Sequence, residues 1–132
     1  MKIFYTINPH IENLSMNTLI KDFRYFLQKY YRKTIGPRYF KHKNRQFQIG
    51  IFPEKTKKEI KEPHLHMILE IKLNEIKKFQ SFIKSQFKQK YPSTTDDLQF
   101  ITHTEPKVWA YCLKEDLNII TNSDLYIKAN NM

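Results

Sequence analysis

The sequence is short of cysteine, glycine and long apolar runs, and each shortage excludes a class of protein. A single cysteine, Cys112, rules out an internal disulfide and every multi-cysteine zinc or iron–sulfur site. Two glycines, Gly36 and Gly50, are too few for the glycine-rich loops that cradle nucleotide phosphates. No apolar run approaches the roughly 18 to 20 residues that cross a bilayer, and the amino terminus lacks a signal-peptide pattern. We therefore expect a cytoplasmic protein that is not secreted and does not bind a membrane.

Acidic residues are also in the minority, and this imbalance points to a class of ligand. The 132 residues contain 23 lysines and arginines against 13 aspartates and glutamates, a formal net charge of +10. Such a charge attracts polyanions, and the release of counterions drives their binding. We expect a nucleic acid as partner, although charge alone does not distinguish DNA from RNA, or an enzyme from a structural protein. The length fits one domain over residues 1–132.

Hydrophobic periodicity predicts the order β-α-β-β-α-β-α. The expected strands cover residues 2–8, 46–52, 64–71 and 98–103, with a turn over 92–97 before the last. The expected helices cover about 15–32, 74–91 and 106–115; Asn13 or Ser15 would cap the first helix, and Asn74 the second. The tail is ambiguous, with a strand or a helical turn around 124–128. Two amphipathic helices interleaved with strands predict a ferredoxin-like α+β fold, an antiparallel sheet with two helices on one face and the other face open to a ligand. We expect the third helix on this open face.

Two histidines alternate along the expected strand HLHMILEI. Leu65, Met67 and Leu69 share its apolar face, so His64 and His66 share the opposite face. Neighbouring side chains on one face are roughly 7 Å apart at the backbone, so the two imidazoles can converge on one divalent metal ion. The pair alone is a weak signal, because two such histidines can equally be solvated or packed side chains.

An acidic residue is needed to complete a metal site of this kind. Continued alternation from the preceding strand places Glu54 on the same face as the histidines, and a hairpin between the two strands would bring it close to them. Glu62 and Glu59 are the alternatives, since both lie in the connector whose path the sequence does not define.

A tyrosine stands on the polar side of the third expected helix, KVWAYCLKE. Trp109, Cys112 and Leu113 form the apolar side, whereas Tyr111 shares its face with Lys107 and Lys114. Neighbouring cations favour the phenolate form of a tyrosine and can hold a phosphate oxygen during attack. Tyr111 is therefore a candidate nucleophile.

Three segments, in order, carry a resemblance to a known family. FYTIN, EPHLHMILEI and YCLKE resemble the three motifs of HUH endonucleases, most closely those of the rolling-circle replication initiators of small circular single-stranded DNA viruses and plasmids. The resemblance spans about residues 3–115. In the family the acidic ligand usually stands eight or nine residues before the first histidine, where this sequence has Thr56 and Lys55. The larger viral initiators also carry a helicase domain that these 132 residues do not include, so we expect a stand-alone nuclease or a fragment, with a separate helicase as a partner.

The resemblance implies a metal-dependent endonuclease that nicks single-stranded DNA, for example at an origin hairpin, and stays attached through a 5′-phosphotyrosine. The chain would then act in the host compartment where the replicon is copied. The residues implied by the resemblance are the nucleophile Tyr111 with Lys114 and the Mg²⁺ or Mn²⁺ ligands His64 and His66, to which strand alternation adds Glu54. The basic stretch over residues 32–45 predicts contacts to the single strand, although it can equally be a solvated loop. The predicted DNA contacts are Tyr5, Asn8, Arg38, Tyr39, Lys41, Lys43 and Lys107. Alternatives are a single-tyrosine insertion-sequence transposase, a non-catalytic nucleic-acid-binding module, and a viral or plasmid structural protein.

Overall fold

The computed structural model describes residues 1–53, 62–101 and 120–121, and within them the four predicted strands and a two-residue strand that was not predicted form one antiparallel sheet. The strands are β1 (Lys2–Asn8), β2 (Gln48–Pro53), β3 (Leu65–Glu70), β4 (Thr95–Ile101) and the two-residue β5 (Ile120–Thr121). Their order across the sheet is β4-β1-β3-β2-β5, and every neighbouring pair is antiparallel. The protein is therefore an α+β protein, as the sequence predicted.

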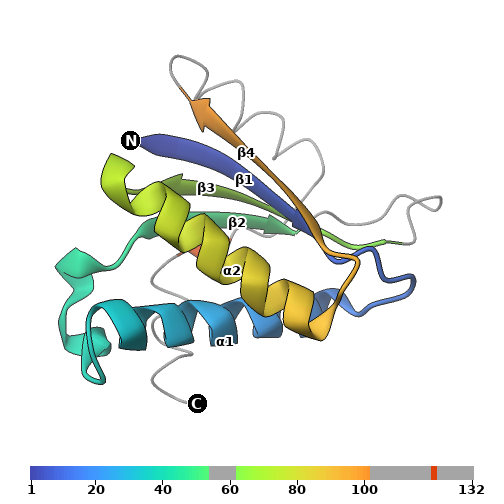
Figure 1. The fold of residues 1–132 in the computed structure, drawn as a ribbon, viewed down its shortest axis with the longest axis horizontal. Helices are drawn as coiled ribbons and strands as arrows, with labels where there is room; N and C mark the ends of the chain where they lie inside the picture. Colours follow the sequence, from blue (N-terminus) through green and yellow to red (C-terminus); the bar gives the residue numbers. More distant parts are fainter. Residues whose placement is uncertain (54–61, 102–119, 122–132) are drawn as a thin grey trace.

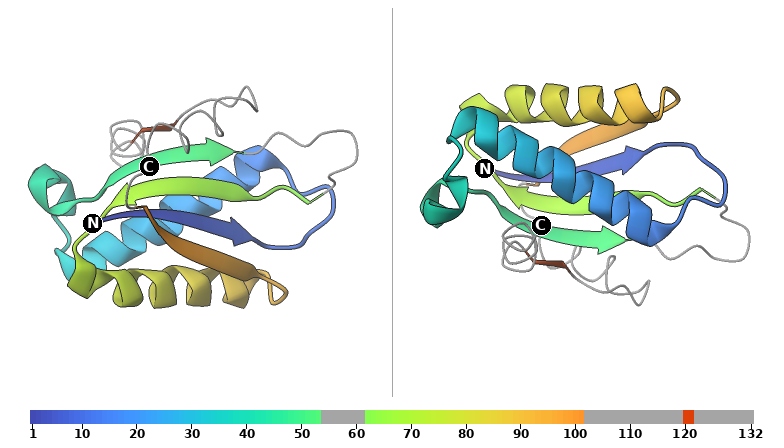
Figure 2. Two further views of the ribbon diagram at one scale, coloured as in Figure 1. Left: turned by 90° about the horizontal axis from the view of Figure 1, so that it is seen from above. Right: turned by 90° about the horizontal axis from the view of Figure 1, so that it is seen from below.

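Both long helices cover the same face of this sheet (Figure 1). Figure 2 shows the molecule from two opposite sides: in the left view the sheet is nearer the viewer, and in the right view the helices are nearer. The helix-covered face holds the apolar set of each inner strand: Ile3, Tyr5 and Ile7 from β1, Ile49 and Ile51 from β2, and Leu65, Met67 and Leu69 from β3. Because side chains alternate along a strand, Phe4, Thr6 and His66 lie on the other face. We call this other face the histidine face.

Helix α1 (Met16–Thr34) begins and ends where local chemistry predicts. The Ser15 side chain accepts a hydrogen bond from the backbone N–H of Thr18, which satisfies one of the free donors of the first turn. At the other end Gly36 has a φ of +126°, a conformation that glycine adopts without a steric penalty. Two short 3₁₀ turns, η1 (Tyr39–Lys41) and η2 (Lys43–Arg45), then lead into β2.

Helix α2 (Ile76–Lys90) follows a 3₁₀ turn, η3 (Leu73–Glu75). The prediction that Asn74 caps this helix was wrong: Glu75 occupies the N-cap position, and its side chain makes no capping hydrogen bond. The helix is held instead by its buried residues Ile76, Phe79, Ile83 and Phe87. Tertiary packing thus outweighs the missing cap.

Aromatic side chains form the centre of the core between sheet and helices. Phe79 is fully buried, and its ring centroid lies 5.2 Å from that of Phe47, 5.5 Å from that of Tyr30 and 6.1 Å from that of Tyr5. One residue of α2 thus contacts aromatic rings from β1, from α1 and from the residue that precedes β2.

Strand β4 begins at Thr95, three residues before the predicted start at Leu98, so the expected turn over 92–97 was too long. The two aspartates that suggested a turn are paired strand residues. Asp96 lies opposite Ile7 and accepts hydrogen bonds from Tyr5 (2.9 Å) and Gln80 (3.2 Å), and its other oxygen lies 3.2 Å from Lys84 Nζ. These distant partners stabilise an aspartate that is locally unfavourable in a strand.

The predicted helix over 106–115 and the predicted element around 124–128 lie outside the described residues. No helix in the described part of the chain is both long enough and apolar enough to cross a membrane.

Candidate metal and nucleic-acid site

The two histidines of the HLH segment lie next to one another at the end of the histidine face. Their ring centroids are 4.9 Å apart, with the planes at 83°. His66 stands opposite Thr6 of β1 and Phe52 of β2, and its ring stacks on Phe4 at 5.4 Å. Both histidines are half-buried. The predicted placement of the imidazoles away from the helices is confirmed.

Each imidazole has its Nδ1 atom beside an oxygen. His64 Nδ1 lies 3.2 Å from the backbone carbonyl oxygen of Glu62, and His66 Nδ1 lies 2.9 Å from Thr6 Oγ1. A carbonyl only accepts, so His64 donates through Nδ1, and the lone pair of its ring is on Nε2. Histidines that bind metals are commonly held in this way, with an oxygen fixing the orientation of the ring through its second nitrogen.

The ring geometry also fits a shared ion. Two imidazoles that bind one ion through nitrogen at about 2.1 Å have ring centroids roughly 5 Å apart. The observed 4.9 Å matches this separation. The separation of the two rings is therefore compatible with one divalent ion between them, and it also equals an ordinary edge-to-face ring contact.

The acidic ligand expected from the sequence, Glu54, lies outside the described residues, as does the alternative Glu59. The other alternative, Glu62, precedes the histidines, but its carboxylate points to a different partner, His10. Within residues 1–53, 62–101 and 120–121, no group of three or more His, Cys, Asp or Glu side chains is gathered closely enough to hold a metal ion. The described part of the site thus contains two neighbouring imidazoles but no gathered third ligand.

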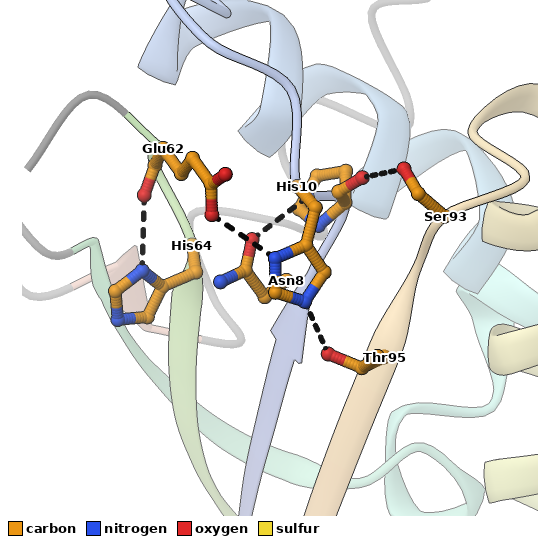
Figure 3. Close-up of polar contacts among 7 residues, drawn as sticks. Asn8, His10, Glu62, His64, Ser93 and Thr95 are labelled. Atoms are coloured by element: carbon orange, nitrogen blue, oxygen red, sulfur yellow. Dashed lines mark hydrogen bonds and ion pairs between the residues drawn. The ribbon is translucent and has the colours of Figure 1, made fainter.

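His10 is a member of this polar region that the sequence analysis missed. Its Nδ1 lies 3.0 Å from Glu62 Oε2 and its Nε2 lies 2.6 Å from Thr95 Oγ1, while its backbone N–H donates to Asn8 Oδ1 at 2.8 Å (Figure 3). The residue has a φ of +57°, in the left-handed region. Non-glycine residues held there often lie at functional sites. His10 thus connects the ends of β1 and β4 to the residues preceding β3.

The nearby turn is fixed by a further contact. Ser93, labelled in Figure 3, donates through Oγ to the backbone carbonyl of Pro9 at 2.8 Å. Pro9 is itself buried. The segment that presents His10 is therefore held at Pro9 as well as at His10. No local sequence pattern indicated the position of the His10 ring, because the partners of the ring are 52 and 85 residues away.

Asn8 is in this polar region, whereas two other predicted DNA contacts belong to the core. Asn8 is half-buried on the histidine face, and its side chain is engaged with His10. Tyr5 has no exposed surface and donates to Asp96; burial and that carboxylate raise the pKa of its phenol well above the usual range. Tyr39 is 4% exposed and packs against Tyr31 and Phe40. We correct the predictions for Tyr5 and Tyr39, since neither presents a face on which a base could stack.

Three cations of the same segment are exposed, namely Arg38, Lys41 and Lys43. They lie in and beside η1 and η2, a turn region held to the core by the ring of Tyr39 and by Gln46 Nε2, which donates to the Tyr39 carbonyl at 3.1 Å. Their position is compatible with contacts to phosphates. The remaining predicted residues, Tyr111, Lys114 and Lys107, lie outside the described residues.

Comparisons with protein-family models, with curated proteins and with solved structures found no match to this chain.

Proposed function

We propose that the protein is a metal-dependent endonuclease that nicks single-stranded DNA through Tyr111, and that it initiates rolling-circle replication and can rejoin the strand. The observation that carries this proposal is the arrangement of His64 and His66. Two adjacent imidazoles, each with an oxygen beside Nδ1, stand on the sheet face opposite α1 and α2. A carboxylate, with Glu54 as our candidate and Glu62 as the alternative, would complete the set of ligands.

The strand order supports a ferredoxin-like arrangement for the domain. Strands β4-β1-β3-β2 alternate in direction, and each helix connects strands that are not neighbours in the sheet. We propose that the helix predicted over 106–115, which carries Tyr111 and lies outside the described residues, packs on the histidine face.

In the proposed reaction Tyr111 is the nucleophile and Lys114 stabilises the phosphate. A bound Mg²⁺ or Mn²⁺ would act as a Lewis acid on the scissile phosphate. The phenol oxygen of Tyr111 forms a bond to phosphorus after giving its proton to solvent. The bond from phosphorus to the 3′ oxygen of the preceding nucleotide breaks, and that oxygen leaves as a hydroxyl. Lys114 balances the charge on the phosphate oxygens.

The product retains a phosphodiester, now between Tyr111 and the 5′ end of the strand. A 3′-hydroxyl can therefore attack it and rejoin the DNA without an external energy source. Thr6 and the Glu62 carbonyl orient the two imidazoles. We propose an origin hairpin as the single-stranded substrate and a separate helicase as the partner that unwinds the duplex.

A single experiment tests this function. Wild-type protein and the Tyr111→Phe variant are incubated with a labelled single-stranded oligonucleotide and Mn²⁺, then denatured in SDS. We expect a slow band, resistant to SDS, with the wild type alone. A set of varied hairpin oligonucleotides that all remain free would contradict the proposal.

The two main alternative functions differ from the proposed one in the products that they give. A non-catalytic nucleic-acid-binding module shifts native gels but leaves no adduct in SDS. A single-tyrosine insertion-sequence transposase forms the adduct too, but it then joins the ends of an element to a new target, whereas an initiator rejoins its own origin strand.

A further inference from the structure

The positive charge of the protein is concentrated on its two long helices. Helices α1 and α2 together hold ten lysines and arginines and one acid, Asp22, a formal charge of +9. The whole chain carries +10. Figure 2 shows both helices on one face of the sheet, and strand alternation places the two histidines on the other face. Most of the net charge therefore lies on the side away from these histidines.

The charged side chains stand on the outer surface of the helices. Lys21, Arg32 and Lys33 of α1 and Lys77, Lys78, Lys88 and Lys90 of α2 are exposed. The acid Asp22 is buried and engaged with Lys90 at 2.7 Å and with the hydroxyl of Tyr91. This outer surface, which we call the helical surface, therefore presents cations with no exposed acid from either helix.

We propose that the helical surface binds the phosphate backbone of double-stranded DNA, while the histidine face takes the single strand. This inference depends on the proposed function in one respect only: the proposed function is the reason for taking the bound polyanion to be DNA. A helix of 15 residues is about 22 Å long, the length of roughly six or seven base pairs of duplex. Two such helices side by side match a rigid, extended row of phosphates.

The chemistry of the helical surface favours a duplex over a single strand. Proteins that bind single strands stack bases on aromatic side chains. Among large hydrophobic residues of α1 and α2, Tyr25 alone is well exposed, at 47%, and Lys29 lies over its ring at 5.4 Å. Phe82 is half-buried beneath Lys33 Nζ, which lies 5.5 Å from its centroid. Lysines hold phosphates as point charges and read no bases, so binding should be independent of sequence.

An anionic membrane is a less suitable partner. Helices that lie in a membrane interface insert a broad apolar face into the lipid. In α1 and α2 the apolar faces are occupied by the core, because Phe23, Phe26 and Leu27 of α1 and Phe79, Ile83 and Phe87 of α2 are all buried.

Two charge-matched triple variants test the proposal. The first removes helical charges (Lys33→Gln, Lys78→Gln and Lys88→Gln), and the second removes turn charges (Arg38→Gln, Lys41→Gln and Lys43→Gln); all six residues are exposed. Binding to a blunt 20-base-pair duplex is measured by fluorescence anisotropy at several salt concentrations, without divalent metal and in the Tyr111→Phe background. Cleavage therefore plays no part in the measurement.

Each phosphate contact contributes about 0.9 to the slope of log K against log salt. We expect the helical variant to lose about two to three units of slope and at least tenfold in affinity, and the turn variant to lose less than one unit. Equal losses in both variants, displacement of the duplex by an equimolar single strand, or binding of the wild type to phosphatidylserine vesicles but not to duplex would each overturn the proposal. The same helical substitutions in a protein that retains Tyr111 test the nuclease separately: normal formation of the covalent adduct would leave the nuclease assignment standing whichever binding result is found.

Discussion

Glu62 contacts His10 with its side chain and His64 with its backbone. The carboxylate lies 3.0 Å from His10 Nδ1, and the carbonyl oxygen lies 3.2 Å from His64 Nδ1. One residue thus joins the left-handed turn after β1 to a proposed metal ligand. Changes to Glu62, or removal of the His10 ring that contacts it, are therefore expected to affect His64 as well.

Replacing His10 separates the role of its ring from the cost of its backbone conformation. A left-handed φ costs alanine roughly 1 kcal/mol and glycine almost nothing. We expect His10→Gly to be more stable than His10→Ala by about that amount in urea denaturation. Both variants lack the ring, so both should nick about tenfold more slowly than wild type. Normal nicking by His10→Gly would show that the ring has no role.

Removing the Thr6 hydroxyl tests the orientation of His66. Valine matches threonine in shape but cannot contact Nδ1, so Thr6→Val should weaken Mn²⁺ binding by ten- to a hundredfold in calorimetry. Thr95→Val is the matched control, because the Thr95 hydroxyl contacts His10 and neither imidazole of the pair. Its Mn²⁺ affinity should stay within about twofold, and equal losses in both variants would contradict the assignment.

Two adjacent tyrosines should respond oppositely to loss of their hydroxyls. Tyr31 Oη accepts the backbone N–H of Phe47 at 3.0 Å, so Tyr31→Phe leaves a buried donor unpaired and should cost about 1 to 3 kcal/mol. Tyr30 Oη is buried with no hydrogen-bond partner among the described residues. Tyr30→Phe should therefore be neutral or stabilising in urea denaturation at pH 7. A larger loss for Tyr30→Phe than for Tyr31→Phe would contradict this reading.

The raised pKa of Tyr30 should make the folded protein less stable at alkaline pH. Burial, with a smaller effect of Glu75, raises the pKa of Tyr30 from 10.0 to about 12. The unfolded chain therefore loses this proton first, so the stabilising contribution is complete below pH 10 and is lost as the pH rises towards 12. Tyr30 should account for up to about 1.4 kcal/mol per pH unit in that window. Denaturation at pH 9 to 11.5 should show a shallower decline for Tyr30→Phe, and identical slopes would exclude the effect.

Phe79 should be the most costly core residue to truncate. It is fully buried and contacts three aromatic rings, so Phe79→Ala should cost about 3 to 5 kcal/mol. Phe100 is 53% exposed, and Phe100→Ala should cost less than about 1 kcal/mol. Similar losses in urea denaturation would show that the core is not centred on Phe79.

The features predicted correctly from the sequence are those governed by neighbouring residues. Alternation gave β1 its bounds and placed His64 and His66 on the face away from the helices, and Ser15 caps α1 as one of the two expected residues. The errors came from distant contacts. Asp96 looked like a turn residue because Tyr5, Gln80 and Lys84 are remote in sequence. His10 was missed for the same reason.

Burial explains the two errors in the predicted DNA contacts. Tyr5 and Tyr39 were assigned from a motif and from a basic neighbourhood, but each ring packs into the core. The concentration of charge on α1 and α2 was visible in the sequence. Its location opposite the histidines required the sheet order and the placement of both helices on one face.

The most direct test of the central claim is identification of the residue that carries the DNA. The SDS-resistant adduct formed with Mn²⁺ is digested with trypsin and a nuclease, and its peptides are examined by mass spectrometry. The account predicts a nucleotide on Tyr111 and no adduct in a His64→Ala, His66→Ala double variant that still binds single-stranded DNA. A nucleotide on a different residue, or undiminished adduct in the double variant, would contradict it.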